Sequence, residues 1–456
     1  MNRELEFTKK DLKKLIIPLI IEQMLAVTVG MADTIMVSSV GEAAVSGVSL
    51  VDMINILIIN IFAALATGGA VVASQLIGAR ERDRACLSAD QLLLVTFTIS
   101  IAIMTLSLLL REQLLRLLFG VIEHDVMKNA LTYFWISALS FPFIAIYNSC
   151  AALFRAMGNS RVSMVTSFVV NIINIVGNAI CVYAFHMGVA GVALPTLISR
   201  TVGAVIMLVL ITDSRREVYV RFKGFKINFG MIRRILYIGI PSGLENSLFQ
   251  MGRVLVVSII ATFGTVQIAA NAVANNLDSL GTIPGQAMSL AMITVVGRCV
   301  GARDYEQAKY YIKKLMKSAY IVTIAMNASV ILSMPLVLRA YNLSDETLKL
   351  AAILVLIHDG CAMLSWPVAF TLPNALRAAN DVKFTMIVSI ASMWIFRIVF
   401  SYILGKFVGW GAIGVWISMI MDWICRLSFF ITRYRSGKWQ TKYAPMPATM
   451  SVGCGT

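Results

Sequence analysis

Charged residues and histidines are scarce in this sequence. Asp, Glu, Lys and Arg together make up 14% of the 456 residues, and there are three histidines. No HExxH, GxSxG or GxxxxGK motif occurs, so a zinc-protease helix, a nucleophile elbow and a Walker-type phosphate loop are all missing. We therefore expect no catalytic residues, no cofactor and no ATP hydrolysis, and a membrane-embedded enzyme is disfavoured.

Paired cysteines are missing as well. The seven cysteines form no CxxC pair and show no other spacing typical of a metal site. We expect them to be free thiols, several of them inside apolar segments.

Apolar residues, in contrast, fill long runs. They make up 58% of the chain, and the mean hydropathy is +0.80, which is typical of an all-α polytopic membrane protein. The sequence predicts twelve transmembrane helices, at about 15–39, 46–74, 87–110, 131–154, 162–185, 189–212, 235–262, 266–296, 316–340, 350–376, 384–405 and 411–432.

The net charge of +15 follows the alternation of the loops. Of the 39 Lys and Arg residues, 29 lie in the termini and even-numbered loops, six in odd-numbered loops and four within spans, when Lys317 and Arg339 at the two ends of the ninth span are counted with the adjoining loops. The positive-inside rule then predicts a multi-pass protein with both termini in the cytoplasm. We see no cleavable signal, and no soluble surface large enough for nucleic acid.

The chain also repeats itself at an offset of about 223 residues. IPLIIE at 17–22 returns as IPSGLE at 240–245, and IGARERD at 77–83 returns as VGARDYE at 300–306. Two six-span halves with the same orientation favour a carrier that works by alternating access. The predicted divisions are a leader (1–14), an N-terminal lobe (15–212), a linker (213–234), a C-terminal lobe (235–432) and a tail (433–456).

The first span carries two acidic residues, Glu22 and Asp33. A carboxylate near mid-membrane costs roughly 2.5–3.5 kcal/mol, so two in one span indicate a function. Eleven residues of helix place them on one face, roughly 16 Å apart. Pro18, one turn before Glu22, removes a backbone hydrogen bond and allows the helix to bend.

A stripe of asparagines marks the fifth span. Asn171, Asn174 and Asn178 share one helical face. Such amides often join membrane helices by hydrogen bonds, for roughly 0.6–2 kcal/mol each. The second half keeps none of this polar set: at the positions of Asp33, Asn174, Asn178 and the sixth-span Thr196 it has Val256, Arg397, Ser401 and Met419. A purely structural role should be needed in both halves, so this asymmetry favours a functional one.

Several motifs together resemble the multidrug and toxic compound extrusion (MATE) transporters, in particular the bacterial DinF-like branch. They are Pro18 with Asp33-Thr34, IPSGLE at 240–245, LPNALRAA at 372–379 and GVAGVALPT at 188–196. The resemblance implies two six-helix bundles in a bacterial cytoplasmic membrane, with a V-shaped cavity. It also implies export of lipophilic, often cationic compounds in exchange for sodium or protons.

The resemblance also implies a cation site inside the N-terminal lobe. Carried over one at a time, its residues are Asp33, Asn174 and Thr196, but the acid of the fifth helix is replaced by Asn178. The site then has one formal negative charge, which leaves Na⁺ at Asp33 open but favours protons. A carboxyl group shielded from water takes up a proton more readily than one in water.

Residues expected to line a substrate cavity come from both halves. Glu22 and its repeat counterpart Glu245 would attract cationic cargo, unless each caps a kink or pairs with an arginine such as Arg253. The full predicted set is Glu22, Gln23, Glu245, Asn246, Asp278 and Trp366. For Asp278, a structural hydrogen bond with Asn275 is at least as good an explanation. The same holds for the repeat-related pair of Asp52 and Asn55, in which the acid and the amide are exchanged. We expect a monomer, and an alternative function is a flippase for a lipid-linked oligosaccharide, for which Arg253 and Arg397 would hold a diphosphate.

Overall fold

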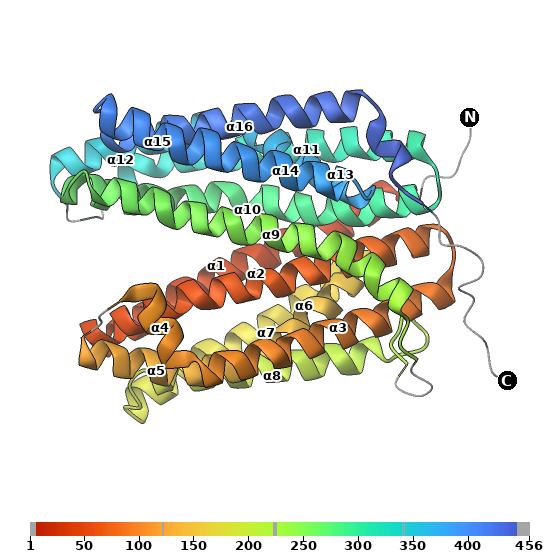
Figure 1. The fold of residues 1–456 in the computed structure, drawn as a ribbon, viewed down its shortest axis with the longest axis horizontal. Coiled ribbons are helices and arrows are strands. Elements are labelled where there is room, and N and C mark those ends of the chain that lie inside the picture. Colours follow the sequence, from red (N-terminus) through yellow and green to blue (C-terminus); the bar gives the residue numbers. More distant parts are fainter. Residues whose placement is uncertain (1–5, 121–122, 222–225, 340, 342, 445–456) are drawn as a thin grey trace. The chain divides into compact units, whose positions relative to one another are not determined.

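The computed structural model describes residues 6–120, 123–221, 226–339, 341 and 343–444. Within these ranges all regular structure is helical (Figure 1). Eleven helices are long and apolar enough to cross a membrane, and a further pair, bent by 46°, makes a twelfth span. The predicted all-α fold with twelve transmembrane segments is therefore confirmed.

Two compact units make up the chain, one from Phe7 to Gly243 and one from Leu244 onward, which also includes Glu6. The helices of the first unit are α1 (Lys9–Ser38), α2 (Glu42–Gly78), α3 (Arg82–Leu109), α4 (Arg111–Phe119), α5 (His124–Leu139), α6 (Phe141–Ala156), α7 (Ser160–Ala179), its π-helical extension η1 (Ile180–Ala184) and α8 (Ala190–Ile211).

The second unit has the same order of spans. Its elements are the second half of α9 (Phe229–Ala261), α10 (Thr265–Gly301), α11 (Tyr305–Arg339), α12 (Asp345–Trp366), η2 (Pro367–Thr371), α13 (Leu372–Ala378), α14 (Val382–Ser392), η3 (Met393–Val399), α15 (Phe400–Tyr402), η4 (Ile403–Phe407), α16 (Gly411–Arg435) and η5 (Lys438–Thr441).

The most buried helix of each bundle reproduces the internal repeat. α2 and α10 have the same length of 37 residues, and the bounds of α10 are those of α2 shifted by 223. Both bury more of their apolar stretch than any other candidate span in the described chain. Each bundle thus has one helix that is buried more deeply than the other spans of the described chain.

The helix α9 begins in the first unit and ends in the second. Its first half packs tightly on α2, because a Cβ atom on Gly68 would come within 2.5 Å of the Ile235 carbonyl oxygen and 2.9 Å of the Gly239 nitrogen. The division between the units therefore falls at Gly243, inside this helix.

The basic segment between α8 and α9 is held on the first turns of α3. Arg82 donates to the carbonyl oxygens of Ser214 and Arg216, each at 2.8 Å, and Arg221 pairs with Asp83 at 2.8 Å. The hydrogen bond that Arg221 donates to Asp83 raises the pKa of Arg221. This part of the predicted linker is therefore anchored to the N-terminal bundle; residues 222–225 lie outside the described chain.

Two local features differ from a simple row of spans. The segment after the third span contains a short helix, α4, whose Leu115 is buried while Leu117 and Leu118 are exposed. The fourth span is broken at Ser140, where α5 ends and α6 begins, with Pro142 in the first turn of α6. A proline is tolerated there because the first amides of a helix lack intrahelical partners.

A glycine in α10 makes room for the largest side chain of the C-terminal core. A Cβ atom on Gly285 would overlap the ring of Trp366, which also stacks on Phe370 with ring centroids 5.0 Å apart. We expect Gly285→Ala to lower the free energy of unfolding by about 1–3 kcal/mol, because overpacking forces the ring out of its place. Thermal unfolding of the purified protein in detergent measures the effect.

A matched control for this substitution lies in the same bundle. A Cβ atom on Gly360 of α12 would meet nothing within 4 Å, so Gly360→Ala should be neutral or stabilising by about 0.5–1 kcal/mol. Equal losses of stability in the two variants would contradict this account of Trp366.

Candidate functional site

The polar interior of the N-terminal bundle lies between α1, α7 and α8. Asp33 is on the last turns of α1, and its Oδ1 accepts a hydrogen bond of 2.6 Å from Asn178 Nδ2 on α7. Glu22, three turns earlier on α1, also reaches α7, where it accepts from Ser163 at 2.7 Å. Both acids of the first span therefore face the same neighbouring helix, as their spacing predicts.

The four residues predicted for a cation site form one connected cluster. Asn178 Nδ2 also contacts Asn174 Oδ1 at 3.3 Å, and Asn174 Nδ2 donates to Thr196 Oγ1 at 2.9 Å. Asn174 and Asn178 are buried, and Asp33 is half-buried. Among the described residues, Asn178 Oδ1 has no hydrogen-bond partner. A buried acceptor without a donor is costly, so the cluster has an oxygen atom available for a cation.

Close packing of α7 on α8 brings these residues together. A Cβ atom on Gly177 would lie 2.7 Å from Pro195 Cβ, so only glycine allows this approach. Pro195 immediately precedes Thr196, and Gly177 immediately precedes Asn178. Directly after these residues α7 widens into the π-helical turn η1, a feature that is frequent at functional sites.

A second carboxylate, which the sequence analysis did not assign to this site, belongs to the same polar interior. Asp52 on α2 accepts hydrogen bonds from Tyr133 at 3.1 Å and Asn55 at 3.3 Å. The negative charge of Asp33 is repelled by that of Asp52 and attracted by the guanidinium of Arg200 on α8. Arg200 itself donates to Ser140 at 2.7 Å, where the fourth span is broken.

The charges of this interior are unequal. Asp33 and Asp52 contribute two negative charges and Arg200 contributes one positive charge, so one negative charge remains without an internal partner. Inside a membrane protein such an excess calls for a cation or a proton. Asp52 thus adds a second carboxylate near the single one that the sequence predicts for this interior.

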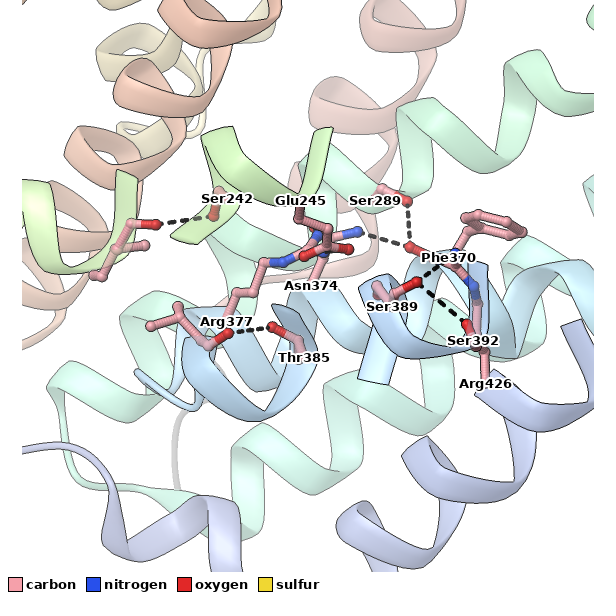
Figure 2. A network of polar contacts seen from close by, with 12 residues as sticks. Ser242, Glu245, Ser289, Phe370, Asn374, Arg377, Thr385, Ser389, Ser392 and Arg426 are labelled. Carbon is pink, nitrogen blue, oxygen red and sulfur yellow. Dashed lines mark hydrogen bonds and ion pairs between the residues drawn. The ribbon is translucent and has the colours of Figure 1, made fainter. Parts of the chain in front are cut away.

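The two repeat-related glutamates are held by two repeat-related arginines. Glu22 pairs with Arg155 at 3.4 Å. Glu245 pairs with Arg377 at 2.5 Å, and Figure 2 draws these two side chains close together. Arg377 also donates to Asn374 at 2.7 Å. Of the alternatives left open by the sequence, the structure shows pairing with an arginine, but the partner of Glu245 is Arg377 and not Arg253.

The remaining residues predicted for a substrate cavity lie at different depths. Gln23 and Asn246, next to the two glutamates, are half-buried. Trp366 is buried in the core of the C-terminal bundle. Their role as cavity residues stays a prediction.

Asp278 belongs to a second polar cluster, inside the C-terminal bundle. His358 Nδ1 lies 3.2 Å from Asp278 Oδ1 and 2.7 Å from Asp359 Oδ1, and all three residues are buried. Their ligand atoms lie within 4.8 Å of one another, close enough to share a metal ion. The His358 ring meets Trp416 and Trp423 edge-on. The sequence analysis predicted neither this cluster nor a metal-binding group outside Asp33.

Known proteins resemble the chain over nearly its whole length. The MatE family model matches residues 18–180 and 241–403. The uncharacterized transporter YisQ of Bacillus subtilis (strain 168) is 28% identical, covering 93% of this chain and 94% of YisQ. The probable multidrug resistance protein NorM of Thermotoga maritima is 25% identical, covering 97% and 95%.

The fold has solved counterparts too. A structure described as the outward-facing conformation of a multidrug resistance MATE family transporter of the MOP superfamily superposes with a TM-score of 0.88. The two chains are 22% identical, and the match covers 95% of this chain and 96% of that one. The likeness extends to all twelve spans.

Proposed function

Since the chain belongs to the MatE family of membrane transporters, we propose that it is a secondary active multidrug exporter that exchanges its substrate for H⁺ or Na⁺ at Asp33. Support comes from relatives that carry the name multidrug resistance protein. No ATP-binding motif accompanies the spans, so an ion gradient is the source of energy.

The single observation that carries the proposal is the cluster of Asp33, Asn174, Asn178 and Thr196. It lies inside one bundle, contains a carboxylate with unbalanced charge and has a buried oxygen without a donor. Such an ionisable group inside a membrane bundle marks an ion or proton pathway. Binding and release of a cation there changes the charge of the bundle, which is what coupled transport requires.

Protons are the coupling ion that the geometry favours. Amide N–H groups, not oxygens, face the acceptors of the cluster: Asn178 donates to Asp33 and Asn174 donates to Thr196. Sodium needs several oxygen ligands at once, and of the two amide oxygens only Asn178 Oδ1 has no hydrogen-bond donor among the described residues. A proton needs only the Asp33 carboxylate.

The substrates are lipophilic compounds, exported across a bacterial cytoplasmic membrane by a chain acting as a monomer with both termini in the cytoplasm. The support is the sorting of Lys and Arg between loops and the bacterial source of the relatives. The charge of the cargo does not follow from Glu22 and Glu245, because Arg155 and Arg377 neutralise them.

Everted membrane vesicles test the proposal. Two lipophilic dyes of opposite charge, ethidium and 1-pyrenebutanoate, are followed while a pH gradient or a sodium gradient is imposed in turn. We expect an acidic lumen to drive accumulation of at least one dye, at least ten-fold above vesicles that lack the protein. Accumulation of neither dye under either gradient would refute the exporter.

A further inference from the structure

The C-terminal bundle contains a cavity of about 60 Å³ between α9, α10, η3 and α16. One water needs roughly 10–15 Å³ measured in this way, so the space suits a few waters or one small charged group. Its polar wall consists of Arg253, Arg397, Asn271 and Asn275, and Val256 and Met419 are among its apolar walls.

This cavity is the repeat counterpart of the cation cluster. Adding 223 to Asp33, Asn174 and Thr196 gives Val256, Arg397 and Met419, all of which line the cavity. Asn275 likewise corresponds to Asp52. The C-terminal bundle therefore has a pocket at this place. It has Val256 and Asn275 at the positions of the two acids, and Arg253 and Arg397 line the pocket.

Arg397 has hydrogen-bond donors to spare. Its nearest carboxylate oxygen, on Asp422, is 3.9 Å away, and its Nη2 donates only to the sulfur of Met419 at 3.0 Å. The Arg397 Nε has no partner among the described residues. Arg426 and Ser392 both bind Asp422 Oδ1, at 2.9 Å and 2.6 Å. Asp422 Oδ2, which faces Arg397, forms no hydrogen bond, and at 3.9 Å it is too far away to form one with Arg397.

Arg253 has still less compensation. No hydrogen bond or ion pair joins its guanidinium to any described residue, although it lies in the middle of α9. The nearby acids Asp278 and Asp359 are engaged with His358, and in the described chain no ion pair links them to Arg253 or Arg397. The Arg253 side chain is exposed beside the cavity, so its guanidinium can meet an anion that enters there. Charged side chains within membrane spans mark substrate or ion pathways.

We propose that this pocket binds the acidic group of the exported compounds, namely a carboxylate, sulfonate or phosphate attached to a lipophilic body. Guanidinium groups are the side chains best suited to hold such oxyanions by paired, charge-assisted hydrogen bonds. The amides of Asn271 and Asn275 line the same cavity and add donors, and the lipophilic body stays outside the cavity, which has room for the charged group alone. This inference rests on the proposed function, whose substrate class it specifies.

Binding to the purified protein in neutral-lipid nanodiscs tests the pocket. The probes are 1-pyrenebutanoate, the uncharged 1-pyrenebutanamide and a trimethylammonium analogue, which share one ring system. Energy transfer from tryptophan, including Trp416 in the pocket wall, reports binding. We expect the acid to bind at least ten-fold more tightly than the amide, and Arg253→Gln to remove about ten-fold of that affinity, as the loss of one charged hydrogen bond requires.

Arg253→Gln is the primary variant, because its side chain has no described partner to lose. Arg253→Lys should retain part of the preference for the acid. Lys406→Gln is the matched control: Lys406 lies on the same bundle over the Tyr402 ring, outside this cavity, and its loss should change nothing. Equal affinity for acid and amide, or equal effects of Arg253→Gln and Lys406→Gln, would overturn the proposal.

The same measurement separates this inference from the proposed function. Asp33→Asn should leave the affinity for 1-pyrenebutanoate within two-fold, because Asp33 is not part of the pocket. Arg253-dependent binding without gradient-driven transport would refute the exporter and keep the pocket. Gradient-driven transport without Arg253-dependent binding would refute the pocket and keep the exporter.

Discussion

Asp33→Asn should reduce gradient-driven efflux by at least 100-fold while the protein stays folded. The asparagine has nearly the same shape, and its Oδ1 can still accept the hydrogen bond from Asn178. It cannot take up a proton or supply a negative charge, so the cluster loses its titratable group. The initial rate of dye accumulation in everted vesicles measures the loss, and thermal unfolding in detergent shows that the fold survives.

Asp125→Asn is the matched control, because that carboxylate is exposed at the start of α5 in the same bundle. Its efflux should match the unmodified protein. Undiminished efflux by Asp33→Asn would refute the proposal that Asp33 couples transport to an ion. If Asp52→Asn abolished efflux and Asp33→Asn did not, the coupling group would be Asp52, and the assignment of Asp33 would be wrong.

Most of the fold could be predicted from the sequence, because a bilayer leaves a chain few choices. Backbone polar groups must be paired within lipid, so each apolar run of about twenty residues becomes a helix. The repeat offset of 223 predicted from short motifs reappears in α10, whose bounds are those of α2 shifted by 223. MATE membership was predicted from a set of motifs in both halves and is confirmed, whereas the DinF-like branch stays a prediction.

Breaks within the spans could not be predicted from hydropathy. The bend between α5 and α6 falls at Ser140, where Arg200 from α8 donates a hydrogen bond. The π-helical turns η1 and η3 each directly follow an ordinary helix whose neighbours pack on it. These features depend on contacts between segments that are distant in the sequence, and the hydropathy of a segment does not depend on such contacts.

The candidate site shows the same limit. Loss of the polar set in the second half singled out Asp33 and the asparagines, and the structure places them in contact. Asp52 was read as a structural partner of Asn55, because pairing along one helix is visible in sequence and proximity across helices is not. The exchange of Asp52 for Asn275 between the halves was the available signal.

Arg377→Met should have the largest effect on stability of the changes considered. It would leave the buried carboxylate of Glu245 without its cation, and Asn374 without its donor (Figure 2). Removing one partner of a buried ion pair costs about 3–5 kcal/mol. Thermal unfolding in detergent should show this loss, and the double variant Glu245→Gln with Arg377→Met should recover most of it, since no uncompensated charge then remains.

Arg116→Met supplies the contrast, because its ion pair with Glu112 on α4 is exposed to solvent and exposed pairs contribute about 0–1 kcal/mol. If the double variant were no more stable than Arg377→Met, the cost would come from lost packing and not from the unpaired carboxylate. Both bundles keep a Glu–Arg pair, whereas only one keeps the Asp33 cluster. An element required in both halves belongs to the scaffold, so Arg155→Met should also lower stability. For the same reason the double variant Glu245→Gln with Arg377→Met should regain efflux together with stability.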